Sequence, residues 1–426
     1  MSLLIKGGRL LDPGTGRDGI FDLYIDEGIV IEVSEHIDRP ADRIVDAAGL
    51  WVMPGVTDLH VHLRDPGQTH KETLRTGALA AAHGGVTTIC AMPNTIPAAD
   101  SPEFIREMNA RAKKECLVHV NFIGAVTKGQ LGRELCDIPG MKREGAVFIS
   151  EDGKSVMDLG LYKEAMEIAA REGVTVLAHC EDKSLARDGV MNESAKSKEL
   201  GLAGIPNSTE DVIVARDILL AKETGCRLHL CHCSTRDSVR IIELAKQAGV
   251  RVTAEVCPHH FTLTTDDIPG DSGNHKMNPP IREKEDRDAL IEGLRTGIID
   301  VISTDHAPHT AKEKAAGFAS PFGIAGLETS VSLAMTELVH KGILTPMQLA
   351  ERMSYTPAKI LGNGKGSLAA GKCADITIID PDLEYVIDRN TFVSMGRNTP
   401  FDGRPVKGKA VMTIVDGSIV YEETAS

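Results

Sequence analysis

Two features are absent from the sequence, and each excludes a class of protein. No stretch approaches the run of about 18 apolar residues that a membrane span requires, and the opening segment MSLLIKGGRLLDPG lacks both the basic region and the apolar stretch of a secretion signal. A surplus of positive charge is also missing, since 61 Asp and Glu residues outnumber 47 Lys and Arg residues and the formal net charge is −14. Such a field repels nucleic acid and anionic membranes. We therefore expect a cytoplasmic protein with no nucleic-acid and no membrane partner.

Disulfides are a further expected absence. The chain has nine cysteines, an odd number, and most lie inside apolar runs such as VTTICAM and TVLAHCED, where a free cysteine behaves as a small core residue. We therefore expect reduced thiols. Hydrophobic residues make up 42% of the chain and charged residues 25%, which is typical of a soluble globular protein. The 15 histidines are the feature to pursue, because their placement is uneven.

One pattern recurs from Val56 onward: a short β-branched or apolar run ends in polar residues, and an amphipathic stretch follows. Eight such runs occur, at 55–63, 85–94, 117–125, 145–152, 174–182, 226–234, 250–260 and 298–309. The spacing predicts helices in most of the gaps, including Lys71–His83, Pro102–Lys114, Leu161–Arg171, Thr209–Thr224 and Thr235–Ala248. Ser234, with Asp237 three residues on, has the spacing of a capping box for the last of these helices.

Eight alternating units predict an α/β fold, a (β/α)8 TIM-like barrel whose parallel strands are continuously apolar because helices cover them. The alternative is an open doubly wound sheet. That fold usually has a glycine-rich phosphate turn after its first strand, whereas HVHLRDPG occupies this position here. A barrel carries its chemistry at the C-terminal ends of its strands. Eight histidines fall there: His60, His62, His179, His232, His259, His260, His306 and His309.

The two ends of the chain have a different pattern. Residues 2–53 and 373–422 contain β-rich runs separated by turn residues, and neither piece has enough apolar residues for a core of its own. We therefore predict that both ends pair into one small β-sandwich domain. The predicted division is 1–53 plus 366–426 for this discontinuous domain and 54–365 for the metal-dependent barrel.

The sharpest local signal is the His60-Val61-His62 segment. Residues two apart on a strand share a face, so both imidazoles are predicted to point the same way, with Leu59 and Val61 on the other side. An isolated H-x-H is more often two polar residues at a barrel mouth than a metal chelate. Here, however, three further strand ends each supply one metal-type ligand, His179, His232 and Asp305, and the fourth strand ends in Glu151-Asp152.

Imidazoles and carboxylates converging on one barrel mouth suit Zn²⁺ or a similar divalent ion better than Mg²⁺ or Ca²⁺, which prefer oxygen ligands. Six candidate ligands exceed what one catalytic zinc uses. The pattern therefore indicates a site for two ions, with two histidines on each and a carboxylate or hydroxide between them. Such a site lowers the pKa of bound water and polarises the carbonyl that the water attacks, so it predicts hydrolysis of an amide-like bond.

Eight segments occur in a fixed order along the chain. They are DLHVHLRDPG at 58–67, MPNT at 92–95, HCED at 179–182, CHCST at 231–235, CPHH at 257–260, KMNPPIR at 276–282, STDHAPH at 303–309 and PFGIAGLE at 321–328. Together they resemble the class I dihydroorotases of the amidohydrolase superfamily. The resemblance covers nearly the whole chain. It implies the reversible cyclisation of N-carbamoyl-L-aspartate to L-dihydroorotate in pyrimidine biosynthesis, with one or two Zn²⁺ ions per chain.

The resemblance also implies a role for each candidate ligand. His60 and His62 bind one zinc ion, which Asp305 completes, and His179 and His232 bind the other. Asp152 is the matching bridge. Many relatives bridge the ions with a carboxylated lysine, and Lys154 keeps that alternative open. Asp305 further acts as the catalytic base, which takes a proton from the attacking hydroxide and delivers it to the departing amide nitrogen.

The substrate carries a carboxylate that an acidic surface does not attract, so local donors must bind it. Arg64 lies two residues beyond His62 and can hold a carboxylate with two hydrogen bonds. By resemblance, Asn94 and His309 share this task. The ring amides of the substrate are expected to contact the remaining members of the set, Asn278 and the backbone of Phe322 and Gly323.

Several neighbouring residues are given structural roles. Alternation places Cys231 and Cys233 on the face opposite His232, in the core. His306 is expected to support Asp305 by a hydrogen bond. His259 and His260 are expected to pack at the barrel mouth or to support ligands, and His229 is given no role.

Two alternative functions remain open. The first is another cyclic amidohydrolase, such as a dihydropyrimidinase, hydantoinase or allantoinase, and the carboxylate-binding set speaks against it because uncharged rings do not need one. The second is a non-catalytic, dihydroorotase-like partner of aspartate transcarbamoylase, which should have lost metal ligands. The resemblance also implies a homodimer and an association with aspartate transcarbamoylase.

Overall fold

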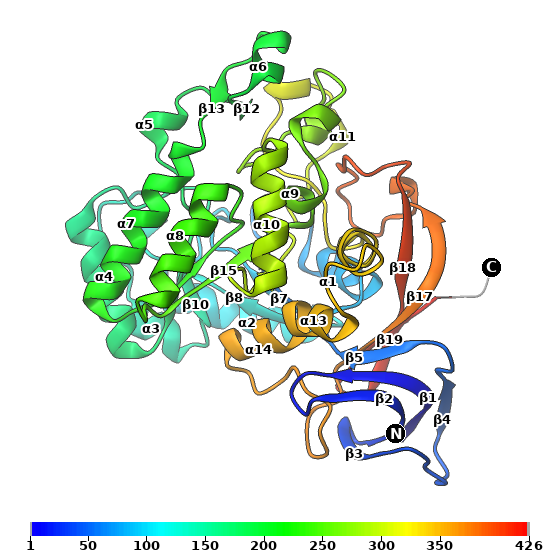
Figure 1. Cartoon of the computed structure of the whole chain (residues 1–426). Coiled ribbons are helices and arrows are strands. Elements are labelled where there is room, and N and C mark those ends of the chain that lie inside the picture. The colour runs from blue at the N-terminus through cyan, green and yellow to red at the C-terminus, as the bar shows by residue number, and fades with distance from the viewer. Residues whose placement is uncertain (1, 424–426) are drawn as a thin grey trace.

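The computed structural model describes residues 2–423 and shows a helix-covered set of parallel strands beside a curved, mostly antiparallel sheet (Figure 1). Eight positions around the parallel set are filled by β6 (Val56–Val61), β7 (Val86–Ala91), β8 (His119–Phe122) with its continuation β9 (Gly124–Ala125), β10 (Phe148–Ser150), β11 (Thr175–Ala178), β14 (Arg227–Leu230), β15 (Val252–Val256) and β16 (Val301–Ile302). Each of the eight predicted runs contains one of these strands.

The parallel strands close into a ring. Pairing runs in parallel from β6 to β8 and from β9 to β16. Ile123 links β8 to β9, and its N–H donates to Ala91 on β7. A parallel bridge between Val61 and His306 joins the last strand to the first, reinforced by the N–H of His62 donating to the His306 carbonyl at 2.8 Å. The predicted barrel is therefore confirmed.

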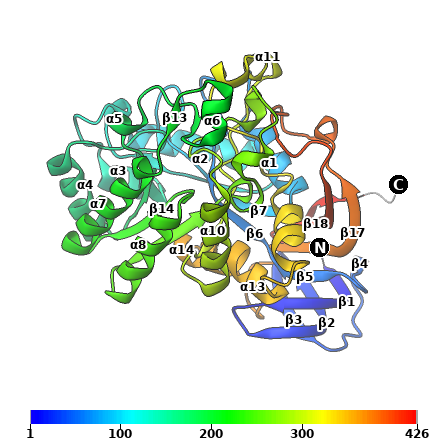
Figure 2. The same ribbon diagram turned by 45° about the horizontal axis from the view of Figure 1, so that its top comes forward.

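Helices cover the outside of the ring. The five predicted segments form α1 (Leu74–His83), α2 (Pro102–Glu115), α4 (Leu159–Glu172), α7 (Ser208–Thr224) and α8 (Arg236–Gln247). Further helices are α3 (Ile138–Arg143), α5 (Lys183–Ala186), α6 (Ala195–Leu200), α9 (Pro258–Thr262), α10 (Lys284–Thr296), α11 (Ala311–Lys314), α12 (Ser330–Ala334), α13 (Pro346–Ala350) and α14 (Thr356–Leu361). Figure 2 shows α4, α7 and α8 packed side by side on the outer surface.

The predicted cap of α8 is wrong by one residue. Thr235 is the N-cap, and its hydroxyl accepts a hydrogen bond from the N–H of Ser238. The side chain of Ser234 instead hydrogen-bonds to the buried carboxylate of Glu210 on α7. Both residues are good capping types, so the buried carboxylate decides between them.

The barrel interior is filled by one side-chain cluster drawn from strands all around the ring. Its buried members are Leu59, Cys90, Met92, Ile123, Phe148, Leu177, Cys231 and Val301. Leu59 and Val61 were predicted to share the face opposite the two imidazoles, which is wrong, because Leu59 belongs to this cluster whereas Val61 packs in the layer between strands and helices. The pairing of β6 with β7 shifts register between Asp58 and Val61, and such a bulge turns an extra side chain inward.

Alternation also fails around His232. Cys231 belongs to the interior cluster, whereas Cys233 packs in the layer between strands and helices. The two thiols therefore do not share a face, because His232 has a positive φ of 35° that interrupts the extended backbone. The prediction that both are core residues is correct, since each is at most 2% exposed.

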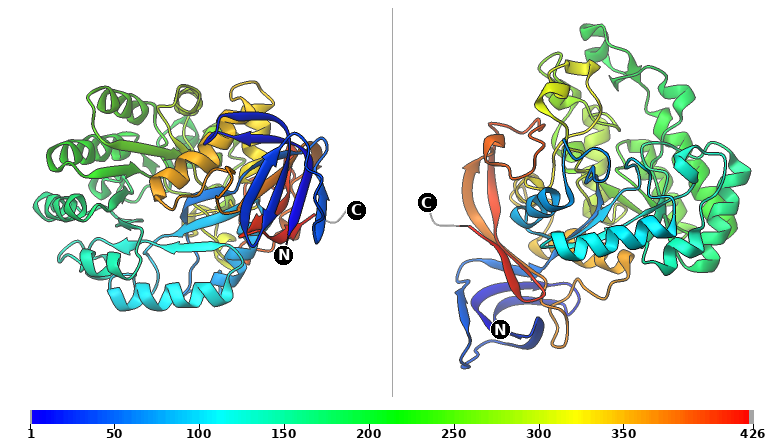
Figure 3. Two further views of the ribbon diagram at one scale, coloured as in Figure 1. Left: turned by 90° about the horizontal axis from the view of Figure 1, so that it is seen from below. Right: turned by 180° about the vertical axis from the view of Figure 1, so that it is seen from behind.

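Both chain ends contribute to a second sheet. Its strands are β1 (Leu3–Asp12), β2 (Arg17–Asp26), β3 (Ile29–Ser34), β4 (Arg43–Asp46), β5 (Trp51–Pro54), β17 (Ile376–Val386), β18 (Pro405–Val415) and β19 (Ser418–Glu422). The N-terminal strands, blue in Figure 3, lie beside the red C-terminal ones, because β5 pairs with β17. The sheet branches at β1, which pairs with both β4 and β5, and encloses a core of its own. The division at 53/54 and 365/366 stays a prediction.

Two short strands outside both sheets, β12 (Met191–Asn192) and β13 (Gly204–Ile205), pair in parallel within the long connection that follows β11. Within residues 2–423, none of the helices has both the length and the apolar character needed to cross a lipid bilayer.

A buried hydroxyl joins the second sheet to the bottom of the barrel, and its removal should destabilise the protein. Thr377 on β17 donates to the Gly85 carbonyl at 2.6 Å and accepts from the Val56 N–H at 3.1 Å. Thr377→Val keeps the shape but leaves both backbone groups unpaired, so we expect a loss of about 2–4 kcal/mol in the free energy of unfolding. Urea unfolding measures this loss in the free energy of unfolding. The exposed Thr391→Val control should change stability by less than about 0.5 kcal/mol; equal losses in the two variants would contradict the assignment.

Candidate metal centre

The barrel brings all six predicted ligands to one place. His60 and His62 come from the end of β6, Asp152 follows β10, His179 follows β11, His232 follows β14 and Asp305 follows β16. A cavity of about 250 Å³ opens above them. All of the six except His60 line this cavity, and His60 is fully buried beneath it.

Asp152 lies at the centre of the group. Its Oδ1 is 3.4 Å from His60 Nε2 and its Oδ2 is 3.5 Å from His62 Nε2. On the other side, the same Oδ1 lies 3.7 Å from His179 Nδ1 and 3.9 Å from His232 Nε2. The carboxylate therefore has one pair of imidazoles on each side.

Asp305 belongs to the first pair. Its Oδ1 lies 3.0 Å from His62 Nε2 and 3.5 Å from His60 Nε2. In the second pair, His179 Nδ1 and His232 Nε2 approach to 2.9 Å. Two subsites thus share Asp152, one formed by His60, His62 and Asp305, the other by His179 and His232.

The spacing of the first subsite fits a divalent cation. Nitrogen and oxygen ligands about 2.0–2.1 Å from a tetrahedral ion lie roughly 3.3 Å from one another, and the atoms of His60, His62, Asp152 and Asp305 are 3.0–3.5 Å apart. The Nε2 atom of His60 is buried and has no hydrogen-bond partner among the described residues. A cation between these atoms would satisfy it.

Electrostatics favour a cation in the same place. Burial opposes ionisation of the Asp152 carboxyl, but the imidazoles around it, His60 first among them, outweigh burial and hold its pKa well below the usual range. The pKa of Asp305 is lowered in the same way, against the effect of burial, by His60 and His62. Two ionised carboxylates at no more than 7% exposure require a compensating positive charge.

Among the described residues, Lys154 makes no hydrogen bond to the six predicted ligands. Its ammonium donates to the carbonyl of Gln130 at 2.8 Å. The carboxylate that lies between the two pairs of imidazoles is that of Asp152.

Outer hydrogen bonds orient the imidazoles, as is common for metal ligands. Asn94 Oδ1 lies 2.8 Å from His62 Nδ1, and its amide nitrogen donates to Asp152 at 3.1 Å. Glu181 lies 3.2 Å from His179 Nε2, and Glu255 lies 2.8 Å from His60 Nδ1. Neither glutamate was among the site residues predicted from the sequence. Two signals could have indicated them: one carboxylate lies inside the apolar strand at 252–256, and the other lies two residues after His179.

Two predictions about nearby histidines are wrong. His306 does not contact Asp305 through its ring: Nε2 lies 3.4 Å from Glu72, and Nδ1 accepts from the N–H of Gly326. His229 was given no role, yet its Nε2 lies 3.1 Å from Glu255.

The predicted substrate residues surround the same cavity. Arg64, Asn94, Asn278, Phe322 and Gly323 line it. His309 stands behind Arg64: its Nε2 lies 2.8 Å from the Phe322 carbonyl and 3.3 Å from the guanidinium. Burial first, and then the charges of Arg64, Lys71 and Lys314, lower the pKa of His309 to about 3. The His309 ring is therefore neutral.

Some of these groups already have partners. The Asn278 amide donates to Glu181 at 3.1 Å, and the Gly323 N–H donates to the Lys276 carbonyl at 3.0 Å. The Gly323 N–H is therefore not free to bind a substrate amide. Within residues 2–423, the Phe322 carbonyl accepts a hydrogen bond from His309 alone and retains one lone pair.

Backbone strain is concentrated at the site. Arg64, His232 and Asp305 have positive φ values of 59°, 35° and 49° although none is glycine. Such conformations cost about 1–3 kcal/mol each and persist only where the surroundings enforce them. The turn after each strand thus aims the side chain into the cavity.

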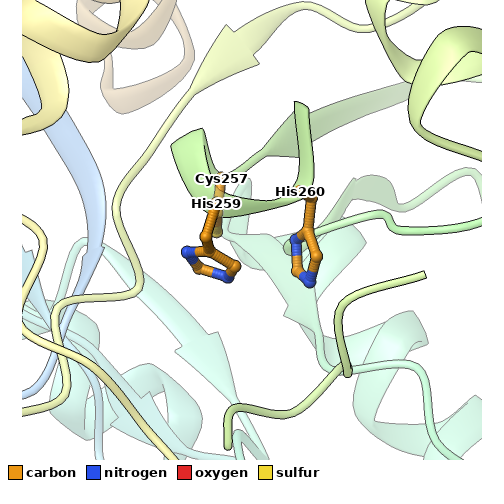
Figure 4. A group of neighbouring side chains, drawn as sticks. All are labelled: Cys257, His259 and His260. Carbon is orange, nitrogen blue, oxygen red and sulfur yellow. The ribbon is translucent and has the colours of Figure 1, made fainter. Parts of the chain in front are cut away.

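A further buried group lies where α9 begins, just after the end of β15. Its members are Cys257, His259 and His260, and Figure 4 shows both imidazoles on the same side of the turn. The ring centroids are 4.2 Å apart, and His260 Nε2 donates to the Pro279 carbonyl at 3.0 Å. Burial lowers the pKa of His259 to about 4. Neither histidine lines the cavity, and both are buried in the packing outside it.

Comparison with known proteins gives a consistent result. The family described as dihydro-orotase-like matches residues 49–238. The chain is 50% identical to a dihydroorotase of Pelotomaculum thermopropionicum, over 99% of both chains, and 47% identical to one of Bacillus cereus over the full length of both. Among solved structures, an L-hydantoinase (dihydropyrimidinase) from Arthrobacter aurescens is 31% identical with a TM-score of 0.90, covering 99% of this chain and 96% of that one. A dihydropyrimidinase from Brevibacillus agri, 23% identical with a TM-score of 0.87 over 99% and 95%, shares the fold.

Metal binding should depend on Asp152 and not on Lys154. A divalent ion that binds the folded state stabilises it, by about 4 kcal/mol when its concentration is a thousandfold above the dissociation constant. We expect Zn²⁺ or Co²⁺ to raise the thermal midpoint of chelator-treated protein, Asp152→Asn to lose most of this rise, and Lys154→Gln to keep it. Metal analysis and thermal unfolding measure both effects. The reverse ranking of the two variants would show that the lysine carries the bridge.

Proposed function

The chain belongs to the dihydroorotase family, and on this premise we propose which of its residues carry the reaction. The protein is a metal-dependent cyclic amidohydrolase that interconverts N-carbamoyl-L-aspartate and L-dihydroorotate in pyrimidine biosynthesis. One observation supports the assignment of residues above all others: two pairs of imidazoles and Asp305 converge on Asp152 beneath a cavity of about 250 Å³. A cavity of that size suits a small ligand.

The proposed cofactor is Zn²⁺, one or two ions per chain. The first subsite offers two imidazoles and one carboxylate, the second offers two imidazoles, and Asp152 is shared. This ligand set is rich in nitrogen, and zinc prefers such a set, whereas Mg²⁺ and Ca²⁺ prefer sets made only of oxygen atoms. When bound, zinc polarises the amide carbonyl and makes water nucleophilic at neutral pH. The ligands in the first subsite are His60, His62 and Asp305, and those in the second are His179 and His232.

Asp305 is the proposed catalytic base and acid. It lines the cavity, and its lowered pKa keeps the carboxylate ionised and able to accept a proton. In the hydrolytic direction it takes the proton of the attacking water and passes it to the amide nitrogen of the ring as the C–N bond breaks. In the synthetic direction the same carboxylate removes the proton from the carbamoyl nitrogen, and the carboxyl oxygen leaves as water.

Arg64, Asn94 and His309 are proposed to bind the carboxylate that the ring carries. The Arg64 guanidinium lines the cavity, and a planar fork of this kind binds carboxylates with two hydrogen bonds. The Asn94 amide nitrogen donates one hydrogen to Asp152 and retains a second. His309, whose Nε2 donates to the Phe322 carbonyl, packs behind Arg64 with that nitrogen 3.3 Å from the guanidinium.

Asn278 and the Phe322–Gly323 segment are proposed to face the ring amides. The free lone pair of the Phe322 carbonyl can accept from a ring N–H. Since the Gly323 N–H is already used by Lys276, the contribution of Gly323 is close approach, which its φ of 127° permits.

A homodimer and an association with aspartate transcarbamoylase complete the proposal. Exposed apolar side chains support it. Ile96, Leu131, Met157 and Leu185 lie in segments that follow barrel strands, on the face that carries the cavity, and are 37–66% exposed. The location proposed for the protein is the cytoplasm.

Asp305→Asn tests the proposed base. Replacing the carboxylate removes the proton acceptor, so we expect kcat for dihydroorotate hydrolysis to fall by about 10²- to 10⁴-fold. The absorbance of dihydroorotate follows the reaction, with and without chelator, and metal analysis shows whether ions are retained. Asp300→Asn, a carboxylate just before β16 that pairs with Lys246, is the matched control and should remain active. More than a tenth of normal turnover in Asp305→Asn would rule out this role.

Arg64→Met tests the proposed carboxylate contact. Losing charge-assisted hydrogen bonds worth about 1.5–3 kcal/mol should lower kcat/KM for dihydroorotate roughly 10- to 100-fold. Hydrolysis of dihydrouracil, which has no carboxylate, should change less than about threefold by the same reasoning. Arg106→Met, on the exposed side of α2, serves as control. A similar loss with both substrates would instead favour a cyclic amidohydrolase for uncharged rings.

A further inference from the structure

Glu255 is a buried carboxylate that the proposed reaction does not use. It lies within β15, is 0% exposed, and sits directly below the candidate metal centre. Its Oε1 accepts from His60 Nδ1 at 2.8 Å and from the backbone N–H of His232 at 3.3 Å. One oxygen atom therefore contacts a proposed ligand of each subsite.

The first contact decides which nitrogen of His60 can bind a metal. A carboxylate accepts a proton from Nδ1 and so fixes the tautomer in which Nε2 has a free lone pair. This Nε2 faces Asp152 and Asp305 at 3.4 and 3.5 Å. The hydrogen bond to Glu255 thus presents His60 to the first subsite in its binding form.

The second contact lies at a strained position. His232 has a φ of 35°, a conformation that a non-glycine residue keeps only when its surroundings enforce it. Glu255 accepts the N–H of this residue, and the side chain of His232 enters the second subsite. The same carboxylate therefore helps to hold the turn that aims His232.

The carboxylate is itself anchored. Its Oε2 lies 3.1 Å from His229 Nε2, and His229 Nδ1 lies 2.8 Å from the Thr253 hydroxyl. Burial opposes ionisation of Glu255, but His229 and His60 together hold its pKa well below the usual range. Both oxygens of the carboxylate are therefore held by hydrogen bonds, and one of them contacts a residue of each subsite.

The outer contacts of Asn94 and Glu181 differ from those of Glu255, which alone of these three residues contacts an imidazole residue of each subsite. Asn94 contacts His62 and Asp152, which belong to the first subsite and the bridge, and Glu181 contacts His179 of the second subsite. Glu181 also lines the cavity, whereas Glu255 does not.

We propose that Glu255 is a positioning residue that couples the two metal subsites, with His229 as its anchor. The proposal rests on the ligand assignment given under Proposed function. It predicts that losing this one carboxylate weakens metal binding at both subsites, although Glu255 does not line the cavity.

Glu255→Gln tests the proposal. The amide is the same size but removes the negative charge and replaces one acceptor oxygen with a donor. Metal-free full-length protein is titrated with Co²⁺ in competition with a chelator. We expect the apparent dissociation constant to rise about 10- to 100-fold, and the visible absorption band of bound Co²⁺ to shift. Asp22→Asn is the matched control: this carboxylate of the second sheet is 3% exposed and accepts two backbone N–H groups, so both readouts should stay unchanged.

The outcomes are distinguishable. If wild-type protein binds no Co²⁺, the ligand assignment fails; if it binds Co²⁺ and folded Glu255→Gln binds equally well with the same spectrum, the coupling role of Glu255 is overturned. Should Glu255→Gln not fold, His229→Leu decides, because it removes the anchoring hydrogen bond and leaves the carboxylate in place. We expect weaker Co²⁺ binding and a shifted band in that variant, and unchanged values would again overturn the proposal.

Discussion

Asp152 lies between four imidazoles, with Asp305 beside the first pair, and both carboxylates are almost fully buried. Ionised groups without water are costly unless opposite charge compensates them. The constraint acts on the whole barrel, because the six side chains come from five strands that are far apart in the sequence. A closed ring brings all five strand ends to one mouth, whereas an open sheet would leave its two edge strands far apart.

Strain at the strand ends is part of the same arrangement. In an extended strand, successive side chains point to opposite faces. Regular strands alone therefore cannot direct the side chains at several strand ends toward one point. The positive φ values of His232 and Asp305 and the register shift in β6 break the alternation where a ligand must turn inward. The rest of the barrel supports these turns through buried hydrogen bonds, such as those to Glu210, Glu255 and Asp58.

These local breaks explain what the sequence could and could not predict. Hydrophobic runs that end in polar residues predicted all eight strands. Because parallel strands point in one direction, their ends meet at one mouth of the barrel, and the sequence could therefore predict that the six candidate ligands lie together. The side of Leu59 and of Cys231 did not follow, because a bulge and a positive φ leave no clear mark in a pattern of period two. The partner of His60 could not be foreseen either. Glu255 lies 195 residues away, and only the closed ring brings the two together.

The barrel frame does not by itself select a substrate, because a hydantoinase shares it with a TM-score of 0.90. On the proposed assignment, selection depends on the wall opposite the proposed metal ligands, where Arg64 lies beside a neutral His309 and near Lys71. The net charge of −14 does not conflict with an anion bound there. Charges farther apart than a Debye length, about 8 Å at physiological salt, are largely screened, whereas a guanidinium at the cavity wall acts at contact distance. The proposed binding of a small carboxylate by Arg64 is therefore compatible with an acidic surface.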